Sequence, residues 1–428
     1  MPAWNGPRTA HNRGLVVGYA PAAGVSSLTA FFGDSLTAHH TWCPHYWTLG
    51  LLGAPLDVVR NGGFNGQSIL GLSTQLDTSW DAAPAGLSGA PALGWIFLRI
   101  GSNNARGAEG SVGVPLGSYG ANYDSVITKC LAAAEHVVIF PVPPIGGDAV
   151  TKNLYISQYN DYLQAKVAAN PTRLHWIDDC ADLTVPGGAV DPTFFIADEL
   201  HFSGAGMIRC AQTAQPQLVA LFAEQGYASA LITDAADVYP AQPQWVVNPL
   251  NTGTSGTRGS GWTGSGSLPT GVHVASNGAG MSGTADLVAA DGGDANTTPW
   301  LRITPSASQS GSAVAITYAG DGRSYGASDP AELEQTMEVR VTGWNGNAIN
   351  RLRAWMQAGG QQITAEQILA MNEAASASGT VTLRHTYKRP AASSGVTGVQ
   401  TTTHYIYLDG AGSSPAGTID IRCLGVRG

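Results

Sequence analysis

Three residue types that together perform nucleophilic acyl transfer occur in two short motifs of the chain. Ser35 lies in Phe-Gly-Asp-Ser-Leu (32–36), and Asp198 and His201 lie in Asp-Glu-Leu-His (198–201). A serine hydroxyl is a weak nucleophile unless a base removes its proton, and an imidazole, which titrates near neutrality, can be that base. A carboxylate close to the imidazole can hold it in the required tautomer and stabilise its charged form. The pattern predicts Ser35 as nucleophile, His201 as base and Asp198 as the partner that orients the base.

Two further motifs carry groups that could stabilise an oxyanion. Residues 61–66 read Asn-Gly-Gly-Phe-Asn-Gly, and residues 100–104 read Ile-Gly-Ser-Asn-Asn. A developing oxyanion needs preorganised hydrogen-bond donors. We expect these donors to be the backbone N–H of Ser35, the backbone N–H of Gly63 and the side-chain amide of Asn103. A glycine at position 63 would let the backbone approach the substrate closely.

The elements that must position these motifs alternate between short apolar runs and helix-like segments up to about residue 226. Such alternation predicts βαβ units and a parallel sheet. The predicted strands are Leu28–Phe32, Leu56–Arg60, Trp95–Ile100, Val137–Val142 and Leu174–Ile177, and the predicted helices span residues 40–52, 66–76, 116–134, 153–168 and 205–224. Because ligands bind outside the carboxyl ends of parallel strands, the four motifs are expected to meet at that edge of the sheet.

The chain changes character near residue 228. A Gly/Ser/Thr-rich tract (251–271) is followed by strand-like runs between turn residues, which predicts an all-β sandwich or jelly roll. One short helix is expected there, at residues 364–375. The predicted division is an N-terminal arm (1–26), an α/β domain (27–228), a linker (229–250) and a β domain (251–428) that could bind carbohydrate or serve in assembly.

Composition excludes several classes of partner. The 428 residues carry a net charge of −9, from 21 Lys and Arg against 30 Asp and Glu, which argues against a nucleic-acid surface. There is no run of 18 apolar residues, so no membrane span is predicted. The five cysteines are widely spaced, and at most one disulfide bridge is expected. The N-terminal apolar stretch is short and interrupted by Pro21, a poor signal peptide. An extracellular or virion-associated location by another route stays open, as does a homo-oligomer.

Together the four motifs resemble the four sequence blocks of SGNH (GDSL-type) hydrolases, over roughly residues 27–226. The resemblance implies a three-layer α/β/α, flavodoxin-like fold and a Ser–Asp–His triad with an oxyanion hole, at the residues named above. It implies no cofactor and no metal. The third block usually reads GxND in this family, and here Asn104 stands in place of the acid. We therefore expect altered loop packing rather than loss of activity.

The expected function is a serine esterase that acts on short acyl esters, O-acetyl above all. Its substrate would be an ester-bearing small molecule or polysaccharide, since an appended β domain would suit a polymer. Thioesterase, lipase and peptidase activities are rivals within the enzyme class. The rival from another class is a non-catalytic glycan-binding or virion tail structural protein with a degenerate hydrolase domain.

Several other groups have competing interpretations. A dense cluster after Ser35 could ligate zinc, although a place in the cleft wall or in the following helix is the simpler interpretation. This cluster consists of His39, His40, Cys43 and His45. Tryptophans in both halves could stack on a sugar or pack in a core, namely Trp42, Trp47, Trp262, Trp300, Trp344 and Trp355. Residues 322–326 match GxSxG but suggest a hairpin turn, and residues 259–264 match GxGxxG without the helix that dinucleotide binding requires.

Overall fold

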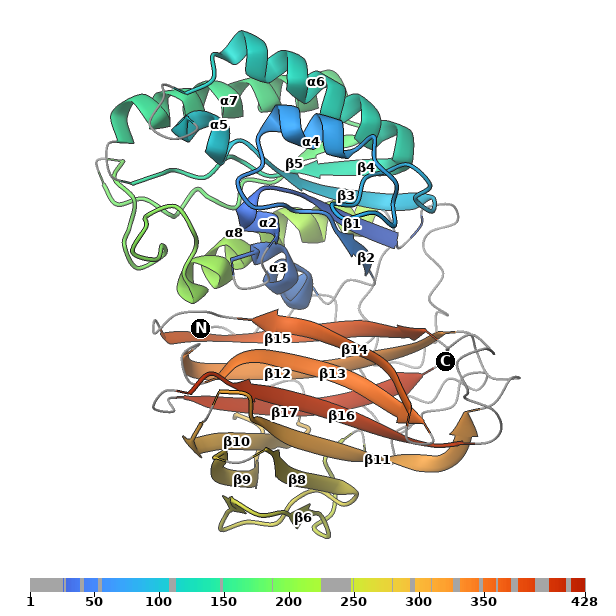
Figure 1. Cartoon of the computed structure of the whole chain (residues 1–428). Helices are drawn as coiled ribbons and strands as arrows, with labels where there is room; N and C mark the ends of the chain where they lie inside the picture. Colours follow the sequence, from blue (N-terminus) through green and yellow to red (C-terminus); the bar gives the residue numbers. More distant parts are fainter. Residues whose placement is uncertain are drawn as a thin grey trace. The chain divides into compact units, whose positions relative to one another are not determined.

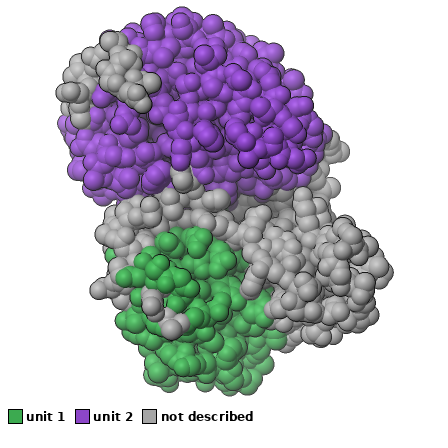
Figure 2. Space-filling view, viewed as in Figure 1, with its two compact units in different colours: residues 1–18, 50–55, 228–428 green, residues 19–49, 56–227 purple. Residues whose placement is uncertain are grey.

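The chain divides into two compact units, residues 19–49 with 56–227 and residues 1–18 with 50–55 and 228–428 (Figure 2). The computed structural model describes residues 26–224, apart from 27, 39–41, 53–55, 108–112, 147–148 and 187, and residues 248–427, apart from 249, 279, 293–296, 309, 326–331, 346–348, 359–360, 371–375, 389–399 and 413–416. The predicted N-terminal arm and most of the predicted linker lie outside these residues. The predicted domain boundaries therefore stay predictions.

A five-stranded parallel sheet forms the centre of the first unit, with the strand order β2-β1-β3-β4-β5 (Figure 1). All four strand pairings are parallel, which confirms the prediction of βαβ units. The strands are β1 (Leu28–Gly33), β2 (Asp57–Asn61), β3 (Leu93–Arg99), β4 (Ala134–Ile139) and β5 (Leu174–Trp176). β1 lies between β2 and β3, so the first three sequence motifs follow three adjacent strands.

Helices cover both faces of this sheet and complete the predicted three layers. The helices are α2 (Ser35–Ala38), α3 (Pro44–Leu52), α4 (Ile69–Gln75), α5 (Ser102–Arg106), α6 (Leu116–Ala133), α7 (Ala149–Ala169) and α8 (Gly204–Glu224). Helices α4 to α7 lie on one face, and α3 and α8 lie on the other (Figure 1). The short helices α2 and α5 were not predicted. No helix in the described parts of the chain is both long enough and apolar enough to cross a bilayer.

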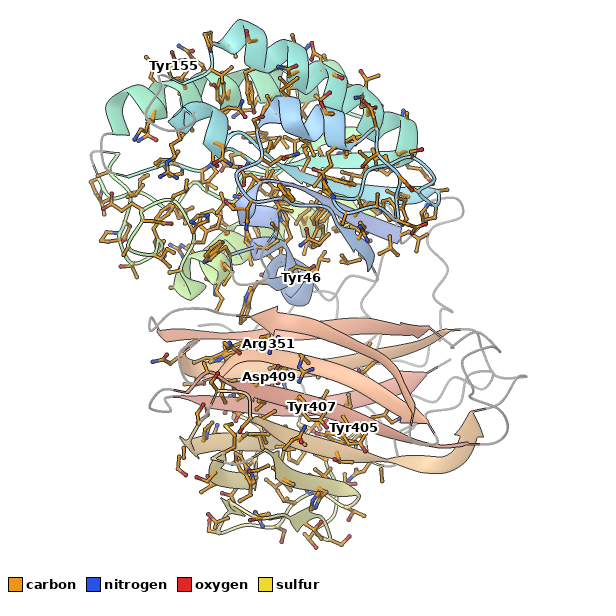
Figure 3. The ribbon with its side chains drawn as sticks, in the orientation of Figure 1. Tyr46, Tyr155, Arg351, Tyr405, Tyr407 and Asp409 are labelled. Atoms are coloured by element: carbon orange, nitrogen blue, oxygen red, sulfur yellow. The ribbon has the colours of Figure 1, made fainter. Side chains whose placement is uncertain are left out.

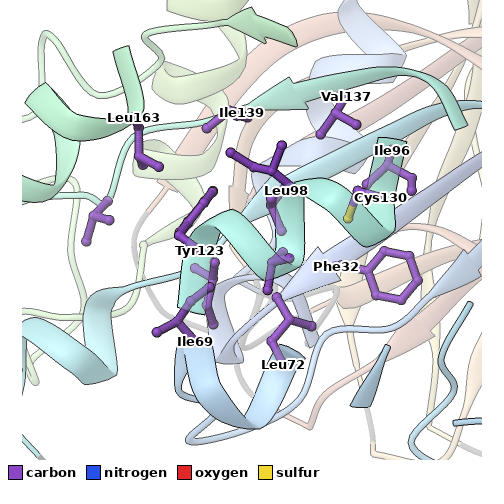
Figure 4. Close-up of a cluster of buried hydrophobic side chains, with 14 of the residues drawn as sticks. Phe32, Ile69, Leu72, Ile96, Leu98, Tyr123, Cys130, Val137, Ile139 and Leu163 are labelled. Atoms are coloured by element: carbon purple, nitrogen blue, oxygen red, sulfur yellow. The ribbon is translucent and has the colours of Figure 1, made fainter. Parts of the chain in front are cut away.

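The core of this unit follows from the two-residue period of the strands. Phe32 and Leu98 point into a cluster with α4, α6 and α7 (Figure 4). Their neighbours Phe31 and Phe97 stack with ring centroids 5.5 Å apart and contact His45 of α3 on the opposite face. Because both faces are covered, the strands have continuous apolar sequences. Each buried side chain of this size contributes roughly 1.5–3 kcal/mol to folding.

The second unit consists of two six-stranded sheets arranged as a β-sandwich (Figure 1). Their strand orders are β15-β12-β17-β10-β9-β7 and β14-β13-β16-β11-β8-β6. The strands are β6 (Thr257–Arg258), β7 (Trp262–Thr263), β8 (Val272–Asn277), β9 (Ser282–Val288), β10 (Trp300–Ala307), β11 (Ala313–Tyr325), β12 (Glu332–Asn345), β13 (Ile349–Ala358), β14 (Gln361–Ala370), β15 (Ser376–Lys388), β16 (Gln400–Gly410) and β17 (Thr418–Arg427). The pairings are antiparallel except for the short β6–β8 and β7–β9 pairs. The predicted all-β architecture is confirmed.

Two local predictions in this unit were wrong. The helix expected at residues 364–375 is absent over its described part, because residues 361–370 form β14 and pair antiparallel with β13. This segment contains good helix formers, but the hairpin supplies ladder hydrogen bonds that override local propensity. The GxSxG segment is also not a turn. Its residues 322–325 continue β11, where Ser324 pairs with Thr401 of β16.

Tryptophans of this unit pack in its core. Trp262, Trp300 and Trp344 are buried, and the side chain of Trp355 lies outside the described residues. The Trp300 ring has the guanidinium groups of Arg340 and Arg422 at 4.5 and 3.9 Å from its centroid. Arg422 lies on β17, which pairs with β10, and Arg340 lies on β12, the next strand, so these cation–π contacts link three strands of one sheet. Core packing, rather than a sugar platform, is therefore the role of these three rings.

Charged and aromatic side chains lie along the paired strands β13 and β16 (Figure 3). Asp409 accepts hydrogen bonds from Arg353, at 2.6 and 2.8 Å, and lies 3.1 Å from Arg351. Tyr405 and Tyr407 stack with centroids 5.9 Å apart. The contacts of Arg351 and Arg353 with Asp409 cross from β13 to β16 and favour one register of the sheet, whereas the two tyrosines stack along β16.

Candidate active site

Ser35, His201 and Asp198 form a continuous hydrogen-bonded chain at the carboxyl edge of the parallel sheet. Ser35 Oγ lies 2.8 Å from His201 Nε2, and His201 Nδ1 lies 2.5 Å from Asp198 Oδ2. The first contact joins residues that are 166 positions apart. The structure thus brings together the three residues expected to be nucleophile, base and orienting acid, in the geometry that proton transfer from serine requires.

Ser35 is held by the turn between β1 and α2. Asp34 is buried, its Oδ1 accepts a hydrogen bond from the backbone N–H of Leu36 at 3.0 Å, and its carbonyl oxygen accepts from Thr37 and Ala38. The side chain of Ser35 is itself nearly buried, with 8% of the residue exposed. The backbone N–H of Ser35 makes no hydrogen bond to the other described residues, so it remains available as a donor.

His201 and Asp198 share a tight turn. The N–H of Ile196 donates to the carbonyl oxygen of His201, and the N–H of Glu199 donates to that of Ile196, both at 2.9 Å. Glu199 adopts a left-handed conformation with φ of 52°. This turn lets Asp198 Oδ1 accept the N–H groups of Leu200 and His201, each at 3.0 Å, while Oδ2 contacts the imidazole. The strained residue is therefore part of the frame that sets the Asp198–His201 contact.

The two carboxyl groups of the site have opposite pKa shifts. Burial pushes the pKa of Asp198 up, but hydrogen bonds from the backbone and imidazole of His201 and from the N–H of Leu200 outweigh it and hold that pKa below its usual value. Burial raises the pKa of Asp34 to about 6, against the opposing effects of Leu36, Arg99 and His201. Asp198 is consequently ionised near neutrality, as an orienting partner must be.

The predicted oxyanion donor Gly63 already has a hydrogen-bond acceptor. Its N–H donates to Asn61 Oδ1 at 3.0 Å, while Asn61 Nδ2 donates to the carbonyl oxygen of Thr37 at 2.7 Å. A Cβ atom at position 63 would lie 2.3 Å from the backbone nitrogen of Ala38. The structure therefore explains this glycine by the close approach of its loop to α2, and its occupied N–H speaks against the expected role as a donor.

Gly66, which sequence reasoning passed over, lies on the same loop with a free amide. It is exposed, has φ of 70°, and its N–H makes no hydrogen bond to the other described residues. The next residue, Gln67, accepts a hydrogen bond at 3.1 Å through its carbonyl oxygen from Asn103 Nδ2. An amide group carries two donor hydrogens, so Asn103 retains one for a ligand. The only signal in the sequence was the final glycine of the 61–66 motif.

Asn104, the departure from the usual third block, is buried and structural. Its Oδ1 accepts the N–H of Ile69 at 2.9 Å, and its carbonyl oxygen accepts the N–H of Val114 at 2.9 Å. Ile69 begins α4, so this asparagine supports the helix that follows the Gly66 loop. An amide oxygen supplies the same acceptor as a carboxylate oxygen would.

The zinc hypothesis for the cluster after Ser35 gains no support. His39 and His40 lie outside the described residues, and Cys43 and His45 are fully buried. The imidazole of His45 lies among the rings of Phe31, Phe97 and Phe140. Burial and the nearby Arg99 lower its pKa well below the usual value. Trp47 is buried in the core, whereas the half-buried Trp42 lies against His201.

The described residues include one other cluster of side chains that carry metal-binding atoms. Ligand atoms of Asp179, Cys180 and Cys210 lie within 4.8 Å of one another. However, Asp179 already forms a fully buried ion pair with Arg99, whose guanidinium also donates to Cys180 Sγ at 3.5 Å. A buried cation at this position repels a metal ion, so the group fits a structural ion pair better.

Residues 31–208 match the sequence profile of the GDSL-like Lipase/Acylhydrolase family. No curated protein matches the chain. Similar solved structures include a G-D-S-L family protein from Desulfitobacterium hafniense DCB-2, with 16% identity, 45% of this chain and 99% of that chain covered, and a TM-score of 0.35. An acetylxylan esterase from Geobacillus stearothermophilus has 16% identity, 46% and 96% covered, and a TM-score of 0.37. A GDSL-like lipase from Bacteroides thetaiotaomicron has 15% identity, 46% and 88% covered, and a TM-score of 0.34.

Proposed function

We propose, from the match of residues 31–208 to the GDSL-like Lipase/Acylhydrolase family, that the protein is a serine esterase that hydrolyses short-chain acyl esters through an acyl-enzyme. The observation that carries the proposal is the hydrogen-bonded chain from Ser35 through His201 to Asp198. A degenerate hydrolase that only binds glycans would have no need to keep all three groups in contact.

In the first half-reaction, Ser35 Oγ attacks the ester carbonyl carbon while its proton passes to His201 Nε2. Asp198 stabilises the imidazolium that forms. The tetrahedral intermediate then collapses, and His201 gives the proton to the departing alcohol oxygen. In the second half-reaction, water attacks the acyl-Ser35 ester with His201 again as base, which releases the carboxylic acid and restores the serine.

The oxyanion of both intermediates requires donors near Ser35. The free N–H of Ser35 and the second amide hydrogen of Asn103 suit this role. For the third donor we propose Gly66 in place of Gly63, because the Gly66 N–H is free and that of Gly63 is held by Asn61. Each such donor typically contributes about 10²–10³-fold to kcat.

The finer proposal is that the acyl group is acetyl and that the alcohol belongs to a polysaccharide. A separate β-sandwich unit on the same chain could bind a polymer. An extracellular or virion-associated setting would suit such a substrate.

Hydrolysis of p-nitrophenyl acetate, butyrate and octanoate by the wild type and by Ser35→Ala tests the proposal. We expect acetate to be the best substrate and Ser35→Ala to lose at least about 10³-fold in kcat. Ser157→Ala, at an exposed position of α7, is a matched control that should behave as the wild type. Equal rates for wild type and Ser35→Ala, or no hydrolysis of these esters or of acetylated polysaccharide, would move the conclusion to the glycan-binding alternative.

A further inference from the structure

The imidazole of His201 has one face covered by an aromatic ring. The Trp42 indole stacks on it with ring centroids 4.1 Å apart and an interplanar angle of 28°. The two imidazole nitrogens point edgewise to Ser35 and Asp198. These edge contacts fix the ring within its plane, but they leave it free to rock about the line that joins the two partners. The indole blocks that remaining motion on one side.

Trp42 is well anchored for such a role. It lies in the turn before α3, and the next residue, Cys43, is completely buried. Within α3, Trp47 is also completely buried. The indole itself is only half-buried. The backbone that follows the ring is therefore held by the core, while the ring meets the site at its surface.

The stack also has an electrostatic consequence. Two carboxyl groups face His201. Asp198 lies on the same turn, and the buried Asp34 follows β1. The positive charge of Arg99 partly offsets the effect of Asp34. Against the face of His201 lies the electron-rich indole, the best of the aromatic rings at binding a cation. A stacked indole attracts imidazolium more strongly than neutral imidazole. This preference is largest in the transition state, where His201 carries the serine proton.

We propose that Trp42 is a positioning residue for His201, which holds the imidazole in line with Ser35 and stabilises its protonated form. This inference rests on the proposed esterase function. It predicts an effect on the chemical step and on the pH dependence, and little effect on the binding of a small ester.

Trp42→Ala and Trp42→Phe test the inference with p-nitrophenyl acetate. We expect kcat of Trp42→Ala to fall about two- to thirty-fold, the range that corresponds to one cation–π contact, with KM within about twofold of the wild type. The acid limb of kcat/KM should move to lower pH by up to roughly one unit, since the imidazolium loses its stabilising face. Trp42→Phe keeps a ring and should lie between the other two proteins.

Trp80→Phe and Trp80→Ala are the matched controls. Trp80 is a half-buried tryptophan of the same unit, and its ring lies 6.0 Å from the guanidinium of Arg60. These variants should therefore leave both kcat and the acid limb unchanged.

An acid limb of kcat/KM that does not move in Trp42→Ala overturns the inference, whatever happens to kcat. Trp42→Phe keeps an aromatic ring in the turn and decides the matter if Trp42→Ala unfolds. Ser35→Ala tests the esterase proposal separately from the role of Trp42. If Ser35→Ala kept its activity, the proposed serine esterase mechanism would be wrong.

Discussion

Asn103 and Asn104 are neighbours in α5, yet their side chains bind opposite groups of the same loop. Asn103 donates to the carbonyl oxygen of Gln67 at 3.1 Å, whereas Asn104 accepts from the N–H of Ile69 at 2.9 Å. Asn103 is half-buried and Asn104 is 3% exposed. The Gly66 loop and the first residue of α4 are thus connected to α5 by two bonds of opposite direction. One asparagine can still donate to a substrate, and the other is fully committed to the fold.

Substitutions at these two positions should separate catalysis from stability. We expect Asn103→Ala to lower kcat about 10²–10³-fold with a small change in the free energy of unfolding, because it removes a proposed oxyanion donor. Asn104→Ala should instead cost about 1–3 kcal/mol, since it leaves the Ile69 N–H buried without an acceptor. Urea unfolding and steady-state kinetics on both variants measure the two effects. The reverse pattern, with Asn104→Ala catalytically dead and fully stable, would contradict the assignment.

Asn104→Asp is the matched control for this pair. A carboxylate oxygen accepts the Ile69 N–H as the amide oxygen does, so activity should stay close to that of the wild type, while the burial of a charge at this position should lower stability as the pH rises toward 7. This variant also restores the residue that usually occupies the third block in SGNH hydrolases.

Asp34 should make the protein less stable as the pH rises through the acidic range. Burial raises its folded pKa from 3.8 to about 6, so the folded state holds this proton more tightly than the unfolded state does. The stabilising contribution is complete below about pH 4 and is lost as the pH approaches 6, a change of about 3 kcal/mol. The measurement is the free energy of unfolding of wild type and Asp34→Asn between pH 4 and 7. The gap between the two curves should widen with pH in favour of the variant, and parallel curves would refute this.

Glu199 should tolerate glycine but not a β-branched residue. Its left-handed φ of 52° is easy for glycine and costs an ordinary residue roughly 1–2 kcal/mol. We expect Glu199→Gly to keep kcat within about twofold. Glu199→Val should lose at least about tenfold, because the turn that aims Asp198 at His201 would shift. Kinetics at pH 7 on both variants test this, and an active valine variant would show that the turn does not need this conformation.

Local sequence patterns were sufficient for the strands and the longer helices of the parallel-sheet unit, and they led to the proposed triad residues. Apolar runs such as Trp95–Ile100 lie within β3 and its end, and the order of the four motifs led to Ser35, Asp198 and His201. These features depend on the spacing of apolar residues along the chain and on the chemical type of single residues. The helix expected at 364–375 shows the opposite case, since pairing with β13 decided its conformation.

The finer details of the site depend on contacts between distant segments. The sequence offered no means to choose between Gly63 and Gly66 as a donor. The choice depends on which backbone N–H donates to Asn61 Oδ1, and this is the N–H of Gly63. The stacking of Trp42 on His201 likewise joins a turn before α3 to the loop before α8. Such contacts follow from how the layers pack, which no local pattern encodes.

The 166-residue separation of Ser35 and His201 has a consequence for biosynthesis. At typical translation rates of 5–20 residues per second, the base is synthesised about 8–33 s after the nucleophile. During this interval β1 and α2 can form, but the serine has no base to activate it. With the proposed triad, a nascent chain cannot hydrolyse esters until the last part of the α/β unit has left the ribosome, and the appearance of activity would report the completion of that unit.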